Sequence, residues 1–345
     1  MFYTEKEIMS QHSALKKTYE YFEEQKEKIT DFFEKQAIKK FTFLGCGSSY
    51  MLAKSGQKLL CGYEDTSALA IAGGDLLVNP KVYENYVKDS IVVCVSRSGK
   101  TSEIVRSVQY LKEAYHCPVV SISMEKENDL VPYSDLDLVM EWCYDESVCQ
   151  TRTVTNLYLA LLMFSAYYGN NEELIQDVKL LIDENEAYKE KYRPLLKEIA
   201  ERDWTKAVVL ADGAVCGIAE EGALAFAEIS RIQGYYANVL DYRHGPMVLN
   251  DERTLNIVLV TENHVELQKA MIEDIKSRKG ILVTASVEDE NLYGADLHVK
   301  LGNCKRMESL GIAYIYIMQM IAYEKAISKG CNPDIPEGLD AYIVL

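Results

Sequence analysis

The sequence predicts an α/β protein made of two tandem αβα units, each with a mainly parallel sheet flanked by helices. Short apolar runs alternate with helical stretches along the chain, which is the pattern of a parallel sheet with crossover helices. The same order of strands and helices then appears a second time at a nearly constant distance in the sequence. The length of 345 residues also suits two domains better than one.

The first unit is expected over residues 37–170, after an N-terminal helical segment formed by residues 1–36. This segment carries aromatic and aliphatic residues at helical spacing, which predicts one or two amphipathic helices. Apolar runs bounded by turn residues predict the strands of the unit. The predicted strands are 41–44, 91–95, 118–122 and 136–141, and the predicted helices are 50–60, 102–113 and 153–168.

Residues 171–203 are charged and helical, so we expect linking helices there, followed by a second unit over 204–330 and a tail at 331–345. The second unit has predicted strands at 208–211, 257–260, 281–283 and 297–299, and an apolar helix at 312–323. Subtracting the positions of corresponding strands gives offsets of 166 (210 − 44), 165 (257 − 92), 162 (282 − 120) and 160 (299 − 139). Four offsets this similar indicate a duplicated domain.

Charge and residue content limit the partners and cofactors that the protein is expected to bind. The net charge is −16, from 53 acidic and 37 basic residues, which disfavours nucleic acid and anionic membranes as partners. The longest apolar stretches, 157–168 and 312–323, are shorter than the ~20 residues of a membrane span. Nine cysteines without a C-x-x-C pair predict reduced thiols in the cytoplasm, and five isolated histidines argue against zinc. We therefore expect neither a metal nor another cofactor.

Two strand-to-helix turns of the first unit are rich in small hydrogen-bond donors. They are Gly45-Cys46-Gly47-Ser48-Ser49 and Ser96-Arg97-Ser98-Gly99-Lys100-Thr101. In a parallel sheet both turns leave the carboxyl ends of strands, where ligands bind, and a helix N-terminus there suits a phosphate monoester. The hydroxyl groups of Ser49, Ser96, Ser98 and Thr101 would complete the phosphate shell. Two other interpretations are that these hydroxyls only cap helices, and that Arg97 and Lys100 are solvated surface cations.

Two better-known phosphate motifs do not fit these turns. A dinucleotide fingerprint has a third glycine where this chain has Tyr50, and a P-loop has a glycine where this chain has Cys94. The second unit has Thr261-Glu262-Asn263-His264 in place of the serine cluster, so only the first unit is expected to hold phosphate. A third turn, Gln150-Thr151, opens a helix and either contacts the substrate or acts as a cap.

Two carboxylates and one imidazole are candidates for proton transfer. Glu221 and Glu228 lie seven residues apart in a predicted helix, within about 20° of each other on one face. His244 lies further along the chain in a predicted loop beside Gly245-Pro246. A carboxylate base and an imidazole suit proton movement on a sugar. The alternatives are a solvated helix face and a structural histidine.

Together these motifs resemble the sugar isomerase (SIS) family in its double-domain form. The matching segments are 45–50, 96–103, 151–155, 221–228 and 243–246, together with the tail 332–345. The resemblance implies two tandem SIS domains and a hexose or hexosamine 6-phosphate substrate. It implies that the phosphate is held by Ser49, Ser96, Arg97 (through its backbone), Ser98 and Thr101, with further substrate contacts from Gly47, Ser48, Gln150 and Thr151.

The resemblance also implies catalytic roles. Glu228 is expected to be the base that moves a proton between C1 and C2 of the sugar, through an enediol or enaminol. His244 is expected to open the sugar ring in the active site of a neighbouring subunit, which implies a homodimer. Glu221 is expected to support this chemistry.

The departures from the family pattern set the expected reaction. Aminotransferring members such as glucosamine-6-phosphate synthase carry lysines where this chain has Ala225 and, by a looser alignment, Ala341. They also begin with a glutaminase domain, whereas this chain begins Met1-Phe2. Without these amines a Schiff base to the sugar has no evident partner, so glutaminase activity and ammonia transfer are not expected. We expect an amino-sugar 6-phosphate isomerase/deaminase that releases ammonia.

Two alternatives remain open. One is a fructosamine-6-phosphate deglycase, because it needs the same proton movement beside a C–N bond. The other is a non-catalytic phosphosugar sensor, which is disfavoured because residues 1–36 show no helix-turn-helix and the domain is duplicated.

Overall fold

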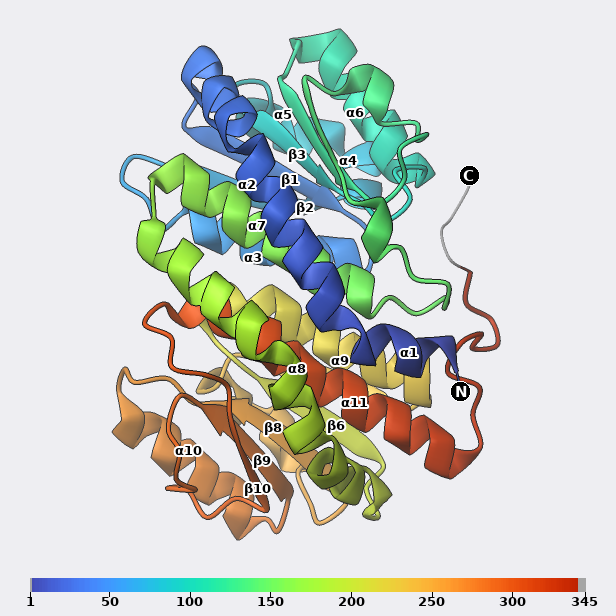
Figure 1. The fold of residues 1–345 in the computed structure, drawn as a ribbon, viewed down its shortest axis with the longest axis vertical. Coiled ribbons are helices and arrows are strands. Elements are labelled where there is room, and N and C mark those ends of the chain that lie inside the picture. Colours follow the sequence, from blue (N-terminus) through green and yellow to red (C-terminus); the bar gives the residue numbers. More distant parts are fainter. Residues whose placement is uncertain (1, 341–345) are drawn as a thin grey trace. The chain divides into compact units, whose positions relative to one another are not determined.

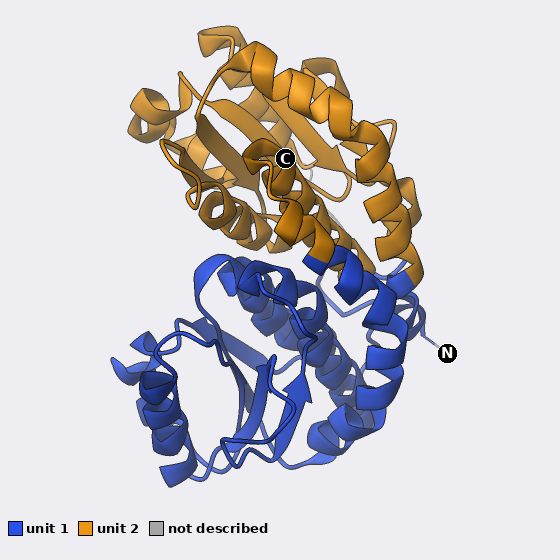
Figure 2. Cartoon of the chain, turned by 60° about the vertical axis from the view of Figure 1, so that its left-hand side comes forward, with its two compact units in different colours: residues 1–12, 146–149, 177–339 blue, residues 13–145, 150–176, 340–345 orange. Residues whose placement is uncertain are grey.

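The computed structural model describes residues 2–340, and the chain divides into two compact units (Figures 1 and 2). Unit 1 comprises Met1–His12, Glu146–Cys149 and Asp177–Leu339. Unit 2 comprises Ser13–Asp145, Gln150–Gln176 and Asp340–Leu345. The first predicted sheet therefore lies in unit 2 and the second in unit 1, and the N-terminal residues belong to the unit of the second sheet.

Unit 2 contains a five-stranded parallel sheet in the order β2-β1-β3-β4-β5. Its strands are β1 (Lys40–Gly45), β2 (Ser67–Ala72), β3 (Ile91–Val95), β4 (Val119–Ser123) and β5 (Leu136–Val139). Its helices are α2 (Gln11–Gln36, which begins in unit 1), α3 (Ser48–Leu60), α4 (Gly73–Val78), α5 (Pro80–Val87), α6 (Ser102–Tyr115) and α7 (Arg152–Gly169). The four predicted strands are confirmed, whereas β2 was not predicted.

Unit 1 contains a second five-stranded parallel sheet in the order β10-β9-β8-β6-β7. Its strands are β6 (Lys206–Leu210), β7 (Gln233–Ala237), β8 (Thr254–Leu259), β9 (Ile281–Ser286) and β10 (Leu297–Lys300). Its helices are α1 (Tyr3–Met9), α8 (Glu172–Glu201, which begins in unit 2), α9 (Cys216–Ser230), α10 (Val265–Ser277) and α11 (Gly311–Lys329). Because each strand has a counterpart at the same place in the other sheet, the predicted duplication is confirmed.

Burial explains the apolar runs of the sequence. Every residue of the central strands β3 and β8 is buried, as expected for parallel strands covered on both faces. In unit 2, α4, α5 and α6 contribute to one apolar core cluster with the sheet, while α3 packs with α7. The apolar helices α7 and α11 are buried along most of their length, and no helix within residues 2–340 is long and apolar enough to cross a membrane.

A buried lysine joins α8 to the N-terminal residues within unit 1. Lys189 is fully buried, and its Nζ donates to the carbonyl of Met9 at 2.7 Å and lies 3.2 Å from Nδ1 of His12. Burial lowers the pKa of Lys189 to about 7, although Glu186 and Glu190 act in the opposite direction. Charging this group therefore opposes folding.

This burial predicts a pH dependence of stability. The unfolded lysine keeps its proton up to its ordinary pKa of 10.5, whereas the folded one releases it near 7, so between these values the unfolded state binds more protons. Stability from this residue should rise with pH across that window, by at most about 1.4 kcal/mol per pH unit. Urea unfolding at pH 7.5 and 9.5 should show this rise for the wild type relative to Lys189→Met; parallel pH profiles would contradict it.

Candidate active site

The two serine-rich turns of unit 2 leave its sheet side by side. β1 and β3 are parallel neighbours, and the chain continues from β1 to β2 on one side but from β3 to β4 on the other. Such a topological switch point, at the carboxyl edge of the strands, is where open α/β sheets bind ligands. The expectation that both turns meet at one edge of the sheet is therefore confirmed.

The first turn brings a helix N-terminus close to the end of β1. Gly47 has a φ of +54°, a conformation that favours glycine. A Cβ on Gly45 would lie 2.4 Å from the backbone of Ser49, so the turn closes only with glycine there. α3 begins directly after Gly47, and both Ser48 and Ser49 are buried. The turn thus places the N–H groups of a helix start and two hydroxyl groups at the edge of the sheet.

The second turn is stabilised by its own serines. Ser96 Oγ accepts a hydrogen bond from the N–H of Gly99 at 3.0 Å, and Ser98 Oγ accepts one from the N–H of Lys100 at 3.1 Å. A hydroxyl that accepts still has its hydrogen to donate, so both serines remain able to bind a phosphate oxygen. Thr101 occupies the N-cap of α6, but its side chain makes no capping hydrogen bond. The capping interpretation therefore does not apply to Thr101.

The two cations of this turn differ in their surroundings. Arg97 is only 4% exposed, and its guanidinium lies 5.6 Å from the centre of the Tyr144 ring. Lys100 is half-buried and forms an ion pair with Glu125. The interpretation of Arg97 as a solvated surface cation is therefore wrong. A hollow of about 610 Å³ beside the turn is lined by Lys100, Met124, Glu125, Lys126, Glu127, Glu141 and Tyr144.

The third turn is organised by an aspartate that the sequence did not single out. Asp145 is 1% exposed, and its Oδ2 accepts hydrogen bonds from the N–H groups of Thr151 (2.8 Å) and Thr153 (2.9 Å). This carboxylate occupies the place of an N-terminal cap for α7. Thr151 is fully buried, and Oε1 of Gln150 is buried with no hydrogen-bond partner among the described residues. The only sequence signal was an acid shortly before a predicted helix start.

The two predicted carboxylates of unit 1 both lie on α9. This helix packs against α11 and β7, and a Cβ on Gly234 of β7 would lie 1.8 Å from the carbonyl oxygen of Ala223. Glu221 is only 1% exposed and Glu228 is half-buried. A solvated face is therefore the wrong interpretation for Glu221. Their helix runs from Cys216 to Ser230, so the predicted helix around both glutamates is confirmed.

His244 lies in a separate loop of unit 1. It comes directly after a short 3-10 turn (Asp241–Arg243), and its N–H donates to the carbonyl of Asp241 at 2.8 Å. Gly245 has a φ of +124°, and Arg243 pairs with Asp274 at 2.7 Å. His244 is exposed, so it is not a buried structural histidine. The backbone turn and the ion pair instead fix the loop that presents it.

The corresponding edge of the sheet in unit 1 is arranged differently. The loop after β8 is bridged by Gln268, whose Oε1 accepts from the N–H of Thr261 at 2.9 Å. Its Nε2 donates to the carbonyls of Thr261 (3.1 Å) and Asn263 (2.6 Å). The side-chain amide of Gln268 thus hydrogen-bonds backbone groups that a ligand at this loop would otherwise contact. A hollow of about 390 Å³ nearby is lined by apolar residues of several elements and by six polar ones, Asp212, Thr261, Asn263, His264, Gln268 and Glu308.

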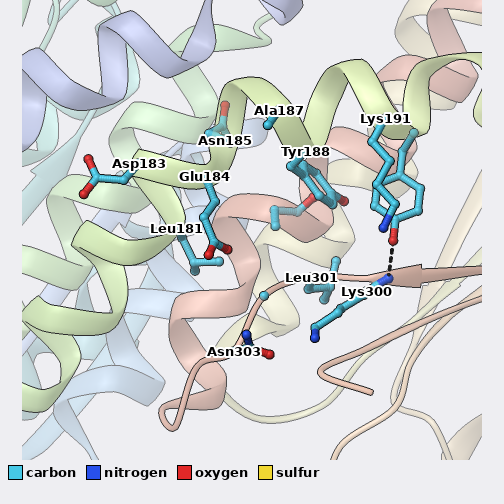
Figure 3. Close-up of a pocket in the computed structure, with 13 residues that line it drawn as sticks. Leu181, Asp183, Glu184, Asn185, Ala187, Tyr188, Lys191, Lys300, Leu301 and Asn303 are labelled. Carbon is cyan, nitrogen blue, oxygen red and sulfur yellow. Dashed lines mark hydrogen bonds between the residues drawn. The ribbon is translucent and has the colours of Figure 1, made fainter. Parts of the chain in front are cut away.

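A further hollow of unit 1, of about 460 Å³, lies between α8 and the segment after β10 (Figure 3). The hydroxyl of Tyr192 accepts a hydrogen bond from the N–H of Lys300 at 3.0 Å, and Tyr188 donates to the carbonyl of Ala313 at 3.0 Å. None of the predicted site residues lines this hollow. Within residues 2–340, no group of three or more His, Cys, Asp or Glu is arranged to hold a metal ion.

Fold and site define the class of protein. Residues 36–168, which contain the first parallel sheet and both serine-rich turns, match the SIS domain family. This part of the chain therefore belongs to the SIS domain family. The second sheet repeats its strand order, so the chain has the tandem arrangement of two such domains.

Similar sequences and solved structures extend this comparison. The chain is 27% identical to glutamine–fructose-6-phosphate aminotransferase (isomerizing) of Wigglesworthia glossinidia brevipalpis over 98% of its own length but only 57% of that protein. It is 23% identical to D-galactosamine-6-phosphate deaminase of Escherichia coli, covering 97% of this chain and 91% of that protein. Among solved structures, glucosamine-6-phosphate deaminase of Thermotoga maritima aligns with a TM-score of 0.83, 25% identity, and coverage of 99% and 100%.

The serine-rich turn makes a testable prediction. Replacing Ser96 and Ser98 by alanine should weaken binding of fructose 6-phosphate, because each hydrogen bond to a charged group contributes about 1.5–3 kcal/mol. Together the two changes should raise Kd roughly a hundredfold or more in calorimetry. Thr261→Ala in the corresponding loop of unit 1 serves as the control and should leave Kd unchanged. Equal affinity of the double variant and the wild type would exclude this turn as the phosphate site.

Proposed function

We propose that this protein is a phosphosugar isomerase that acts on an amino-sugar 6-phosphate and releases ammonia. The observation that carries the proposal is the pair of serine-rich turns at the switch point of unit 2. Two relatives that align over nearly their full length are named as deaminases of hexosamine 6-phosphates, which supports this substrate class.

The phosphate would be held without a basic surface. Ser49, Ser96, Ser98 and Thr101 supply hydroxyl groups, and Arg97 supplies its backbone. Gly47, Ser48, Gln150 and Thr151 are the proposed contacts to the rest of the sugar. The N-termini of α3 and α6 add partial positive charge at the same edge. A helix N-terminus and local donors suffice for an anion even in a protein of net charge −16.

The proton chemistry is assigned to unit 1. His244 opens the sugar ring by protonating the ring oxygen, and Glu228 removes the proton from C2 to give an enaminol. Returning a proton to C1 gives a ketimine, and addition of water then releases ammonia and leaves the ketose 6-phosphate. Glu221, which is buried on the same helix, is proposed to support Glu228.

Ala225 supports release of ammonia over amine transfer. It lies on α9 between the two glutamates and is 2% exposed, so the helix offers no amine for a Schiff base at that position. Water is then the acceptor in this proposal, which directs the reaction towards release of the nitrogen. Ala341, the second position where aminotransferring members carry a lysine, lies outside the described residues.

We also propose a homodimer in which His244 serves the neighbouring subunit. The loop that carries His244 continues to Val248 and Leu249, which are 74% and 66% exposed. Large apolar side chains this exposed are typical of a protein interface. All nine cysteines are free thiols, which supports the proposed cytoplasmic location.

One observation favours the second candidate, a fructosamine-6-phosphate deglycase. The hollow beside the Ser96–Thr101 turn is lined by Glu125, Glu127 and Glu141 against two lysines. An acidic lining suits the cationic tail of a sugar–amino acid conjugate. The deaminase remains our first choice because Glu125 is neutralised by Lys100.

A panel assay tests the function. Purified protein should release ammonia from glucosamine 6-phosphate or galactosamine 6-phosphate, measured together with the ketose 6-phosphate formed. Release of an amino acid from fructoselysine 6-phosphate would favour the deglycase. Glu228→Gln should abolish turnover while leaving the Kd of the phosphosugar within a few-fold, since it removes only the base. Wild-type rates in this variant would exclude Glu228 as the base.

Hybrid dimers test the shared site. Glu228→Gln and His244→Ala proteins should each be inactive alone, but a refolded mixture should recover part of the wild-type activity, because one site of the hybrid is intact. Unmixed samples taken through the same refolding are the control. No recovery, in a mixture shown to contain hybrids, would place both residues in the same subunit's site.

A further inference from the structure

A buried carboxylate of the N-terminal helix binds the segment that precedes the third turn. Glu7 of α1 is 3% exposed, and its Oε1 accepts hydrogen bonds from the N–H groups of Glu146 (2.6 Å) and Ser147 (3.2 Å). Its Oε2 accepts one from the hydroxyl of Ser147. Both oxygens of Glu7 are therefore used on two successive residues of unit 1.

The C-terminal region binds the same segment from another direction. The carboxylate of Asp334 accepts hydrogen bonds from the N–H groups of Tyr3 (2.9 Å) and Thr4 (2.8 Å), at the start of α1. The carbonyl of Asp334 accepts a hydrogen bond from the N–H of Val148 at 2.9 Å. Residues near both ends of the chain thus fix residues 146–148.

The second half of the chain repeats this arrangement. Asp177 of α8 is 7% exposed, and its Oδ2 accepts hydrogen bonds from the N–H groups of Lys305 (2.8 Å) and Arg306 (2.6 Å). The bound pairs are separated by 159 residues (305 − 146), close to the 161 residues (297 − 136) that separate β5 from β10. In both halves, a carboxylate on a helix before the sheet binds two successive N–H groups after the fifth strand.

The two bound segments lead into different parts of the chain. After residues 146–148 the chain runs directly into Gln150 and Thr151, whereas after Arg306 it enters a 3-10 turn (Met307–Leu310) that holds no predicted substrate contact. We propose that Glu7 is a positioning residue that sets Gln150 and Thr151 for the substrate. This proposal rests on the proposed function, since it takes Gln150 and Thr151 as substrate contacts.

The experiment compares matched carboxylate deletions in the full-length protein. Glu7→Ala should lower kcat/KM by roughly tenfold to a hundredfold, because small displacements of a positioning group have effects of this size. Asp177→Ala removes the equivalent hydrogen bonds and should lower Tm similarly, but it should leave kcat and KM within about twofold. Glu7→Gln should restore most of the activity, because one amide oxygen can still accept both N–H groups.

Amide hydrogen exchange gives a readout that does not need turnover. Glu7→Ala should speed exchange in residues 146–153, and Asp177→Ala should do so in residues 305–310. Equal kinetic losses in both alanine variants, or unchanged kinetics in Glu7→Ala despite faster exchange, would overturn the proposal.

An inactive wild type would overturn the proposed function instead. In that case the Kd of fructose 6-phosphate decides the positioning role. A weaker affinity in Glu7→Ala but not in Asp177→Ala would support it, and equal or undetectable binding in all three proteins would overturn it.

Discussion

Parallel pairing at the centre of each sheet is the constraint on which the rest of the structure depends. β1 pairs with β3 and β6 with β8. From the two strands of each pair, the chain continues to strands on opposite sides of the sheet. Because the central strands are buried on both faces, their polar loops have to lie at the sheet edges. The edge at the carboxyl ends therefore collects a helix N-terminus from each neighbouring strand. The serines, glycines and carboxylates of the turns act on a framework that this strand pairing already sets.

The same framework stabilises corresponding turns differently in its two copies. In unit 2 the turn after β3 is stabilised by serines whose hydrogens remain available to a ligand. In unit 1 the turn after β8 is bridged by Gln268, which already engages its backbone groups. Both solutions satisfy the backbone, as buried polar groups require. The first solution leaves two hydroxyl hydrogens for an anion, and phosphate binding by the first half alone stays a prediction.

Much of the fold could be predicted because apolar periodicity is a local signal. Four strands of each sheet were found, but β2 (Ser67–Ala72) and β7 (Gln233–Ala237) were missed. Both are partly exposed strands that contain alanine, glycine or serine, whose weak strand propensity is overcome by pairing with β1 and β6. The turns were predicted from their small residues. Glu7 and Asp177 were not, because a side chain that binds backbone groups 128 to 140 positions away leaves no spacing pattern in the sequence. Asp145 and Gln268 bind backbone groups only five to eight positions away, but a single acid or amide near a helix start is too common to be singled out.

The position of β5 and β10 explains why such carboxylates are needed. Each is the edge strand of its sheet, so the segment after it has no neighbouring strand to accept its N–H groups. A buried N–H without a partner is costly, and a carboxylate that accepts two of them satisfies both at once. Glu7 and Asp177 do this from helices that precede their sheets in the chain. The N-terminal helix therefore satisfies backbone groups of a segment that follows β5 in the chain.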